Sequence, residues 1–372
     1  MKPVLKALVV ASTLALAAGA AEARDLRLAP GAPPVHPAYA MYKTMMVNLP
    51  KETNGAYTGT IIGPEVVNIV QVKQALQSSL AEVGNLLPLF VPADLPSTAL
   101  AGDLALQATN PHAMAAAMTE YVVTCKDCQR EFKKFGAVYT GSGSSDIYVI
   151  LSTKPARSLK ELKGLRLRSG GAPYARWAEA AGAAPTQVPV SDQFEAVSQG
   201  VLDGSMGSIQ DLLSYRLIDV VKYVIDLPLG TYHTTANFAV ATAAWKEMSP
   251  EQRAGFVRAA NLANVAFTQD WGYDRSGAAR KAAREAGIEF IKPSQDMLDQ
   301  IEKFRANDIK AAAKLSKDQL GLDDGAEKIE RFQALVKKWT GIVKELNGDP
   351  AAIAQRIQKE VWDKVDYSTY GL

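Results

Sequence analysis

The fold is decided by residues 147–200, IYVILSTKPARSLKELKGLRLRSGGAPYARWAEAAGAAPTQVPVSDQFEAVSQG. An apolar, β-branched run opens it at Ile147–Ser152, and a second strand-like run, LRLRS, follows at Leu165–Ser169. The segment Tyr174–Ala181 has a helical pattern and stops before Gly182, a residue that suits a left-handed helix end. Strands that alternate with short helices predict an α/β lobe with a parallel, doubly wound sheet.

The N-terminal third repeats this alternation and predicts a second α/β unit. Strands are predicted at Asp25–Ala29, Thr58–Ile62 and Leu80–Asn85, with a helix over Ala38–Leu49. A further helix is expected to begin at Gly63-Pro64-Glu65 and to bury Val66, Ile69 and Val70. The chain length also suits two domains, with crossovers near 136–146 and 227–236.

The last third is mainly helical in pattern. Ser249-Pro250-Glu251-Gln252 combines an N-cap, a proline in the first turn and a capping-box glutamine. A final long helix carries one apolar face, made of Ile329, Phe332, Val336, Trp339 and Val343. Such a face packs against the rest of the protein.

Residues 1–23 have the features of a cleaved signal peptide. Lys2 precedes the apolar run Val4–Ala18, and Lys6 lies within it. Ala21-Glu22-Ala23 then supplies the small residues of a cleavage site. A membrane anchor is the alternative, but the run is short for a bilayer span. We expect a mature chain that starts at Arg24, that is periplasmic and that does not span the membrane. A net charge of +2 without a basic block argues against nucleic acid as a partner.

The only cysteines, Cys125 and Cys128, form a C-x-x-C pair. In an exported chain a short-loop disulfide is favoured, and a thioredoxin-like redox motif is the alternative. No metal site is expected, because His36, His112 and His233 have no ligand spacing. Nucleophile elbow, phosphate-loop and zinc-helix motifs are missing from the sequence, and Gly141-Ser142-Gly143 fails as a dinucleotide fingerprint. We therefore expect no catalysis.

Two arginines in LKGLRLR (Leu162–Arg168) are the strongest candidates for ligand contact. Arg166 and Arg168 lie two apart on a strand and so share one face of the sheet. Arg168 falls at the carboxyl end of that strand, where α/β sheets place ligands, and a guanidinium matches a carboxylate bidentately. An internal salt bridge or a solvated sheet edge explains the same residues equally well.

The order of four segments resembles the substrate-binding receptors of tripartite ATP-independent periplasmic (TRAP) transporters, the DctP-type family. These segments are LKGLRLR at 162–168, GAAPT at 182–186, AVSQGVLDG at 196–204 and the helix start WKEMSPEQR at 245–253. The resemblance implies a periplasmic-binding-protein-like fold, with two doubly wound lobes joined by a hinge and a long helical C-terminal brace. The expected lobes are 24–145 with 236–280 and 146–235, with 281–372 packing on both.

The resemblance also implies a function. It predicts a receptor that captures an organic anion, closes over it and delivers it to the small and large membrane subunits of a TRAP transporter, without a cofactor. The resemblance implies that Arg168 corresponds to the arginine with which the family binds the ligand carboxylate. A receptor for another importer or for a sensor kinase, or a secreted enzyme, is the alternative.

Departures from the family pattern predict a roomier and less polar pocket. Gly207 stands where the family commonly has a ligand-contacting Asn, and Val190 stands where Phe is frequent. Tyr148 occupies a position that is basic in some members, which favours a bulky or aromatic carboxylate over a simple dicarboxylate. Asn85, at the end of a first-lobe strand, is either a polar ligand contact or a turn residue.

Overall fold

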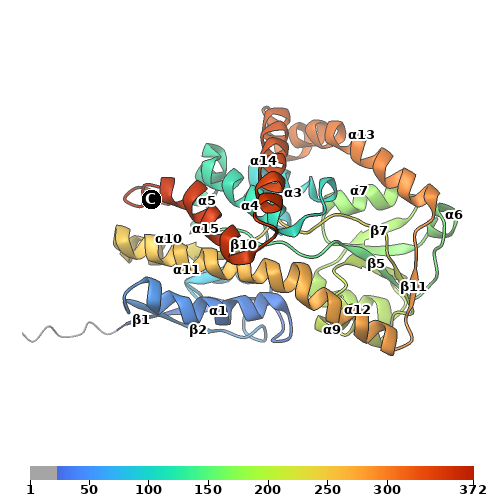
Figure 1. The fold of residues 1–372 in the computed structure, drawn as a ribbon, viewed down its shortest axis with the longest axis horizontal. Helices are drawn as coiled ribbons and strands as arrows, with labels where there is room; N and C mark the ends of the chain where they lie inside the picture. The colour runs from blue at the N-terminus through green and yellow to red at the C-terminus, as the bar shows by residue number, and fades with distance from the viewer. Residues whose placement is uncertain (1–22) are drawn as a thin grey trace, which may run out of the picture.

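The computed structural model describes residues 23–372 and contains two β-sheets flanked by helices (Figure 1). The predicted signal peptide, residues 1–23, lies outside the described residues except for residue 23. In residues 23–372, no helix has the combined length and apolar character that a membrane crossing requires.

The first sheet has the strand order β2-β1-β3-β10-β4. Its strands are β1 (Arg24–Ala29), β2 (Tyr57–Ile61), β3 (Val83–Leu86), β4 (Ala137–Val138) and β10 (Ala236–Ala241). Strand β1 pairs in parallel with β2 and β3, whereas β10 runs antiparallel to β3 and β4.

The second sheet has the order β11-β9-β5-β8-β6-β7. Its strands are β5 (Val149–Ser152), β6 (Arg166–Ser169), β7 (Ala184–Gln187), β8 (Gly204–Gly207), β9 (Tyr223–Ile225) and β11 (Glu289–Ile291). Strand β6 is parallel to β7 and β8, and β5 is antiparallel to β8 and β9.

The α/β class and the two-sheet architecture are confirmed, but the prediction of purely parallel sheets is wrong. Strands β5 and β10 are the ones that the chain enters directly after crossing between the sheets, and each runs antiparallel to its neighbours. Each of these two strands is reached from the other sheet by an extended segment without a helix, whereas parallel neighbours are usually joined by a helical crossover.

The predicted helix after Gly63 is also wrong. Residues after Pro64 form turns, and the helix α2 begins only at Val72 (Val72–Gln77). Val66 and Val70 are more than half exposed, and only Ile69 of the expected apolar stripe is buried. The apolar spacing there therefore does not reflect a buried helix face.

Helices lie around both sheets. Between β1 and β4 in the sequence lie α1 (Pro37–Glu52), α2, α3 (Pro96–Gly102), α4 (Pro111–Thr124) and α5 (Lys126–Phe135). Those connected to the second sheet are α6 (Leu159–Leu162), α7 (Ala172–Ala180), α8 (Gln193–Ser198), α9 (Asp211–Ser214) and α12 (Arg275–Glu285). The others are α10 (Thr242–Glu247), α11 (Pro250–Gln269), α13 (Gln295–Leu320), α14 (Gly325–Glu345) and α15 (Pro350–Glu360).

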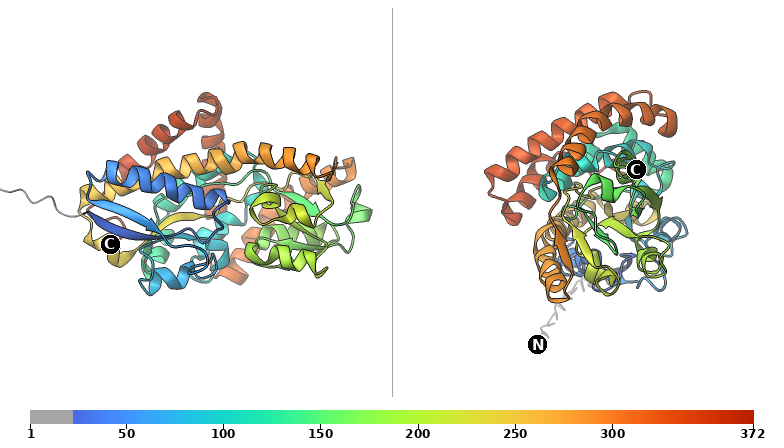
Figure 2. Two further views of the ribbon diagram at one scale, coloured as in Figure 1. Left: turned by 90° about the horizontal axis from the view of Figure 1, so that it is seen from below. Right: turned by 90° about the vertical axis from the view of Figure 1, so that its right-hand side faces the viewer.

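Two extended segments, residues 139–148 and 226–235, cross between the sheets side by side. The backbone amide of Ser145 donates to the Tyr232 carbonyl (2.9 Å), and that of Tyr148 donates to the Gly230 carbonyl (2.8 Å). Helix α11, which starts with the predicted Ser249 capping box, continues through a π-helical turn (Asp270–Asp274) into α12, and together they run along the length of the molecule past both sheets (Figures 1 and 2). The lobe boundaries given above remain predictions.

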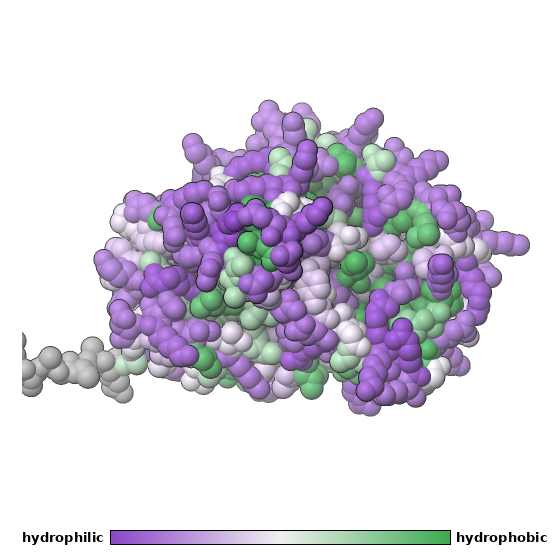
Figure 3. All heavy atoms as spheres, in the orientation of Figure 1, coloured by the Kyte–Doolittle hydropathy of each residue, from purple (hydrophilic) through white to green (hydrophobic). Residues whose placement is uncertain are grey.

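The long C-terminal helices are present as expected. Helix α14 buries Ile329, Phe332, Trp339 and Val343 and packs mainly on α4. On α13, the Arg305 guanidinium donates to the carbonyls of Leu106 and Pro228, both at 2.7 Å. These contacts connect α13 to the N-terminal part of the chain and to a crossing segment. The face seen in Figure 3 is largely hydrophilic, with scattered apolar side chains.

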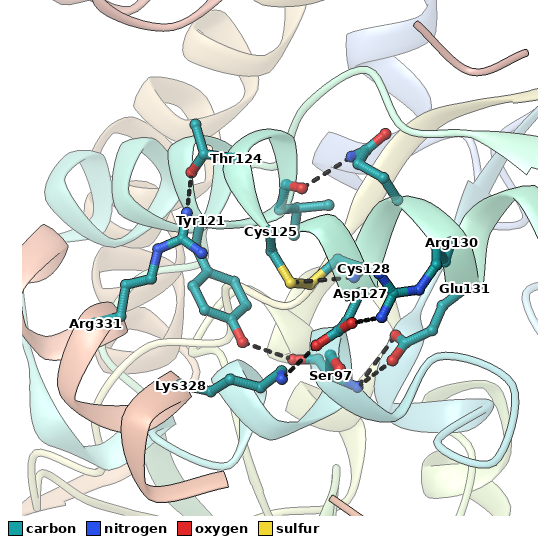
Figure 4. The surroundings of a disulfide bond; sticks show 12 residues. Ser97, Tyr121, Thr124, Cys125, Asp127, Cys128, Arg130, Glu131, Lys328 and Arg331 are labelled. Atoms are coloured by element: carbon teal, nitrogen blue, oxygen red, sulfur yellow. Dashed lines mark hydrogen bonds and ion pairs between the residues drawn. A yellow bond between two sulfur atoms is a disulfide. The ribbon is translucent and has the colours of Figure 1, made fainter. Parts of the chain in front are cut away.

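The disulfide prediction is confirmed: Cys125 and Cys128 are bonded at the start of α5 (Figure 4). Both cysteines are buried, and the Cys125 sulfur also accepts a hydrogen bond from the Cys128 amide. Beside them, Lys328 of α14 forms an ion pair with Asp127 (2.6 Å). The bridge therefore fixes the α4–α5 corner against which the C-terminal helices pack.

Candidate ligand-binding site

A cavity of about 560 Å³ of empty space, its mouth included, lies where both sheets and the crossing segments meet. The N-terminal unit contributes Ala32, His36, Ala38, Ile69, Asn85, Leu87 and Phe90, and the second sheet and its loops contribute Arg168, Gly170, Val190, Asp211 and Tyr215. The crossing segments, β10, the end of α11 and the π-helical turn after it contribute Tyr148, Tyr232, Thr235, Asn237, Phe267 and Trp271. A concave, mainly apolar site with few polar groups is typical of small-molecule binding.

Arg168 is the buried cation of this cavity. The residue is 2% exposed. Its Nε donates to the Val188 carbonyl (2.9 Å), and its Nη1 is buried without a hydrogen-bond partner. No acidic side chain among residues 23–372 forms a salt bridge with it, so both alternatives considered from the sequence, an internal salt bridge and a solvated edge, are wrong for Arg168. A buried guanidinium with a free N–H is costly unless an anion meets it.

Arg166, two residues earlier on β6, has the opposite environment. Its side chain is 47% exposed and forms a bidentate pair with Asp203, with an Nη2–Oδ1 distance of 2.8 Å. Together with Lys154 it holds the pKa of Asp203 well below the usual range. One residue of the LKGLRLR motif is thus structural, and the other faces the cavity.

Gly170 leaves room for the Arg168 guanidinium. A Cβ placed on Gly170 would lie 3.1 Å from Nη1 and 3.4 Å from Nη2 of Arg168. The guanidinium therefore lies against bare backbone just after β6, and its position is set by that backbone and by the Val188 carbonyl.

A stack of tyrosines forms the wall beside the guanidinium. The Tyr148 ring lies between the rings of Tyr174 (5.0 Å between centroids) and Tyr232 (6.2 Å), both within 26° of parallel. Burial raises the pKa of all three hydroxyls, so they stay protonated, while the Arg168 charge acts in the opposite direction. The Tyr232 hydroxyl has no protein partner.

A second aromatic cluster, formed by His36, Tyr215 and Trp271, lines another part of the cavity. The His36 ring lies 5.5 Å from that of Tyr215 and 5.4 Å from that of Trp271. Burial lowers the pKa of His36 to about 3, so the ring is neutral at physiological pH. Its Nδ1 accepts a hydrogen bond from the Ala38 amide, which makes it the N-cap of α1. His36 is thus an uncharged wall residue.

The structure brings together four of the five site residues predicted from the sequence. Arg168, Tyr148, Asn85 and Val190 all line the cavity. Asn85 donates through Nδ2 to the Pro30 carbonyl (3.2 Å), and its Oδ1 has no partner. Gly207 is buried but does not line the cavity; a Cβ there would lie 2.7 Å from Oδ2 of Asp211. Their contact with a ligand stays a prediction.

Asp211, which does line the cavity, was not predicted. It is 2% exposed, and burial raises the pKa of its carboxyl to about 6 although the Arg168 charge and a Gln193 hydrogen bond act against this. His36 and Trp271 were also missed as wall residues. A single Asp at the start of a short helix resembles an ordinary turn residue, and no local pattern distinguishes it.

No three His, Cys, Asp or Glu side chains within residues 23–372 are grouped so that they could hold a metal ion. The polar groups of the residues that line the cavity are one guanidinium, one carboxylate, one neutral imidazole, one indole N–H, amides and hydroxyls. This set recognises an organic molecule through charge and hydrogen bonds.

Two α/β units that enclose such a cavity, joined by two crossing segments and bridged by long helices, define a two-lobed solute-binding protein. The family described as bacterial extracellular solute-binding protein, family 7 (DctP) matches residues 93–315. The chain belongs to this family, and the resemblance drawn from residues 162–253 is confirmed. The protein is therefore a solute-binding receptor by family.

Solved structures of TRAP solute-binding proteins share the fold. One from Bordetella bronchiseptica, with bound mandelate, is 22% identical, with a TM-score of 0.71 over 84% of this chain and 99% of that one. One from Rhodoferax ferrireducens T118, with copurified benzoate, is 18% identical, with a TM-score of 0.75 over 86% and 99%. One from Pseudomonas putida F1, with bound D-glucuronate, is 20% identical, with a TM-score of 0.67 over 83% and 97%.

A curated relative gives no functional information. It is an uncharacterized protein of Haemophilus influenzae, 27% identical over 134 residues. The match spans 36% of this chain and 40% of that relative.

Proposed function

We propose that the protein is a periplasmic receptor for an organic acid with a bulky or aromatic body, which it delivers to the membrane subunits of a TRAP transporter. The observation that carries this proposal is Arg168, which is buried in the cavity and whose Nη1 has no hydrogen-bond partner among residues 23–372. A ligand carboxylate supplies the missing acceptor and the missing negative charge.

The remainder of the cavity supports a bulky or aromatic ligand body. Tyr148 and Tyr232 present rings on one side, and Phe267 and Trp271 present rings on another. Stacked or edge contacts with such rings favour a flat apolar group. The mandelate and benzoate bound by two proteins of the same fold are aromatic acids, which agrees with this interpretation.

Calorimetry on two arginine variants tests the proposal. A thermal-shift screen of carboxylic acids and mass spectrometry of ligand released from the purified protein first supply the probe acid. Arg168→Ala should weaken its binding by about 100-fold or more, because loss of one partner of a buried ion pair costs about 3–5 kcal/mol. Arg166→Ala, on the same strand but paired with Asp203 at the surface, is the matched control and should bind within about twofold of wild type.

Near wild-type affinity in Arg168→Ala, with the variant still folded, would overturn the proposal. Location and delivery have separate tests. Sequencing of the exported protein should give a mature start at Arg24, and acid uptake in cells with the two membrane subunits should require this receptor. The bound acid should be recovered chemically unchanged, as expected of a receptor that binds without catalysis.

A further inference from the structure

The cavity contains a second buried charge, the carboxylate of Asp211. Asp211 and Arg168 are each 2% exposed and both line the cavity. The Arg168 charge favours the ionised form of the Asp211 carboxyl. Within the described part of the chain, no salt bridge joins them. The two opposite charges are therefore held separately on the cavity wall.

The Asp211 side chain does not cap the helix that it begins. It begins the short helix α9, but the turn before that helix is held by other groups: the Ile209 amide donates to Oδ2 of Asp146 (3.2 Å), and the Gln210 amide donates to Oγ of Ser208 (3.1 Å). The Asp211 carboxylate caps neither of these amides.

The carboxylate is instead positioned from one side. Its Oδ2 accepts one hydrogen bond, from Nε2 of Gln193 (3.2 Å), and Gln193 is held in turn by the Ser205 hydroxyl (2.8 Å). Gly207 leaves the space that Oδ2 occupies, since a Cβ there would lie 2.7 Å from it. A buried carboxylate with one long neutral hydrogen bond is under-satisfied, because an ionised carboxylate offers about four lone-pair sites.

Other free acceptors line the same cavity. Oδ1 of Asn85 and Oδ1 of Asn237 are buried and have no partner in the described part of the chain, and their amide orientations are fixed by Nδ2 hydrogen bonds to Pro30 and Asn264. A ligand that carried only a carboxylate would satisfy Arg168 and leave these acceptors unmatched, with a second negative charge added beside Asp211. A hydrogen-bond donor on the ligand would pair with a free acceptor and would also offer the Asp211 carboxylate a favourable contact.

We propose that Asp211 accepts a hydrogen bond from the ligand, so that the receptor selects organic acids that also carry a hydroxyl, amine or amide N–H donor. The inference rests on the proposed carboxylate-receptor function and narrows its substrate class to hydroxy acids and amino-acid-like acids. Arg168 then binds the carboxylate of the ligand, and Asp211 binds a hydrogen-bond donor of the same molecule.

Matched acids with and without a donor test this proposal by calorimetry. The pairs are phenylacetate against mandelate, benzoate against its three monohydroxy isomers, and 3-phenylpropionate against phenylalanine. Wild-type protein should bind at least one donor-bearing acid about tenfold or more tightly than its parent, as a hydrogen bond to a charged group implies. Asp211→Leu should reduce that ratio to about twofold or less, and Asp211→Asn, which keeps an acceptor oxygen, should give an intermediate ratio.

The outcomes separate this inference from the proposed function. Wild-type protein that binds parent acids as tightly as their donor-bearing partners, or a ratio that survives in Asp211→Leu, overturns the role of Asp211 and leaves the carboxylate receptor standing. Binding of none of these acids, and no acid among the ligands released from the protein, overturns both. If Asp211→Leu does not fold, the ratio in Asp211→Asn decides, and an unchanged ratio counts against the proposal.

Discussion

Replacement of Asp211 by Asn should make the ligand-free protein more stable at neutral pH. The folded-state pKa of Asp211 is about 6, raised from an ordinary value of 3.8 chiefly by burial. The folded protein therefore holds this proton more tightly than the unfolded chain does. The contribution of Asp211 to the free energy of unfolding therefore falls as the pH rises from 3.8 to about 6, and the full cost of the ionised carboxylate is present above that range.

The size of the effect follows from the same two pKa values. Each pKa unit corresponds to about 1.36 kcal/mol, so the ionised carboxylate costs the folded state about 3 kcal/mol at pH 7.5. Asparagine has nearly the same shape, keeps an oxygen for the Gln193 donor and carries no charge. Asp211→Asn should therefore gain up to about 3 kcal/mol at pH 7.5, or roughly 5 °C in Tm, and no gain should be left near pH 3.5.

Thermal unfolding of ligand-free wild type and variant between pH 3.5 and 8 measures this gain. Asp203→Asn is a control of opposite sign. The Asp203 side chain is only 5% exposed, and hydrogen bonds from Arg166 and Lys154 hold its pKa well below the usual range. That carboxylate contributes stability above its unfolded pKa and loses it as the pH falls, so the variant should be less stable at pH 7.5. A gain in Asp211→Asn that is constant with pH, or a loss at pH 7.5, would refute the reasoning.

Two further predictions concern the scaffold. Cys125→Ser/Cys128→Ser should lower the free energy of unfolding by about 2 kcal/mol, the loop-entropy value for so short a loop, and reductant should lower the wild-type Tm without affecting the variant. Arg176→Met should cost about 3–5 kcal/mol by denaturant unfolding, because it leaves the buried carboxylates of Asp103 and Asp308 without their shared cation; a loss below 1 kcal/mol would contradict this.

The class of fold could be predicted from local patterns, but its sheet directions could not. Strand and helix patterns predicted the strand at Leu165–Ser169 and the left-handed end at Gly182, and both are present within a residue or two. The antiparallel direction of β5 and β10 depends on where the chain crosses between the sheets. That is a long-range property, and strand spacing carries no information about it.

The sequence predicted only those parts of the candidate site that a motif, or the rule that ligands bind at the carboxyl ends of strands, could indicate. Arg168 was placed at the carboxyl end of a strand, and the structure puts it in the cavity. The two alternatives for Arg168, an internal salt bridge and a solvated sheet edge, could be excluded only from the three-dimensional structure. There Arg168 is buried, whereas the side chain of Arg166 on the same strand is about half exposed. Asp211 reaches the cavity from a short helix and Trp271 from the π-helical turn after α11, and their burial there depends on packing across the molecule.

The two unpaired charges of the cavity weaken the empty protein and prepare it for its ligand. Arg168 holds one free donor, and Asp211 has one long hydrogen bond, so both are incompletely satisfied before binding. If the two groups formed a salt bridge, the empty state would be more stable, but a ligand would have to break that bridge before it could bind. Holding them apart keeps both sites available, and the cost to the fold is recovered only when a molecule with matching groups enters. A ligand of this class should therefore stabilise the protein strongly, by about 2.7 kcal/mol at a hundred times its Kd.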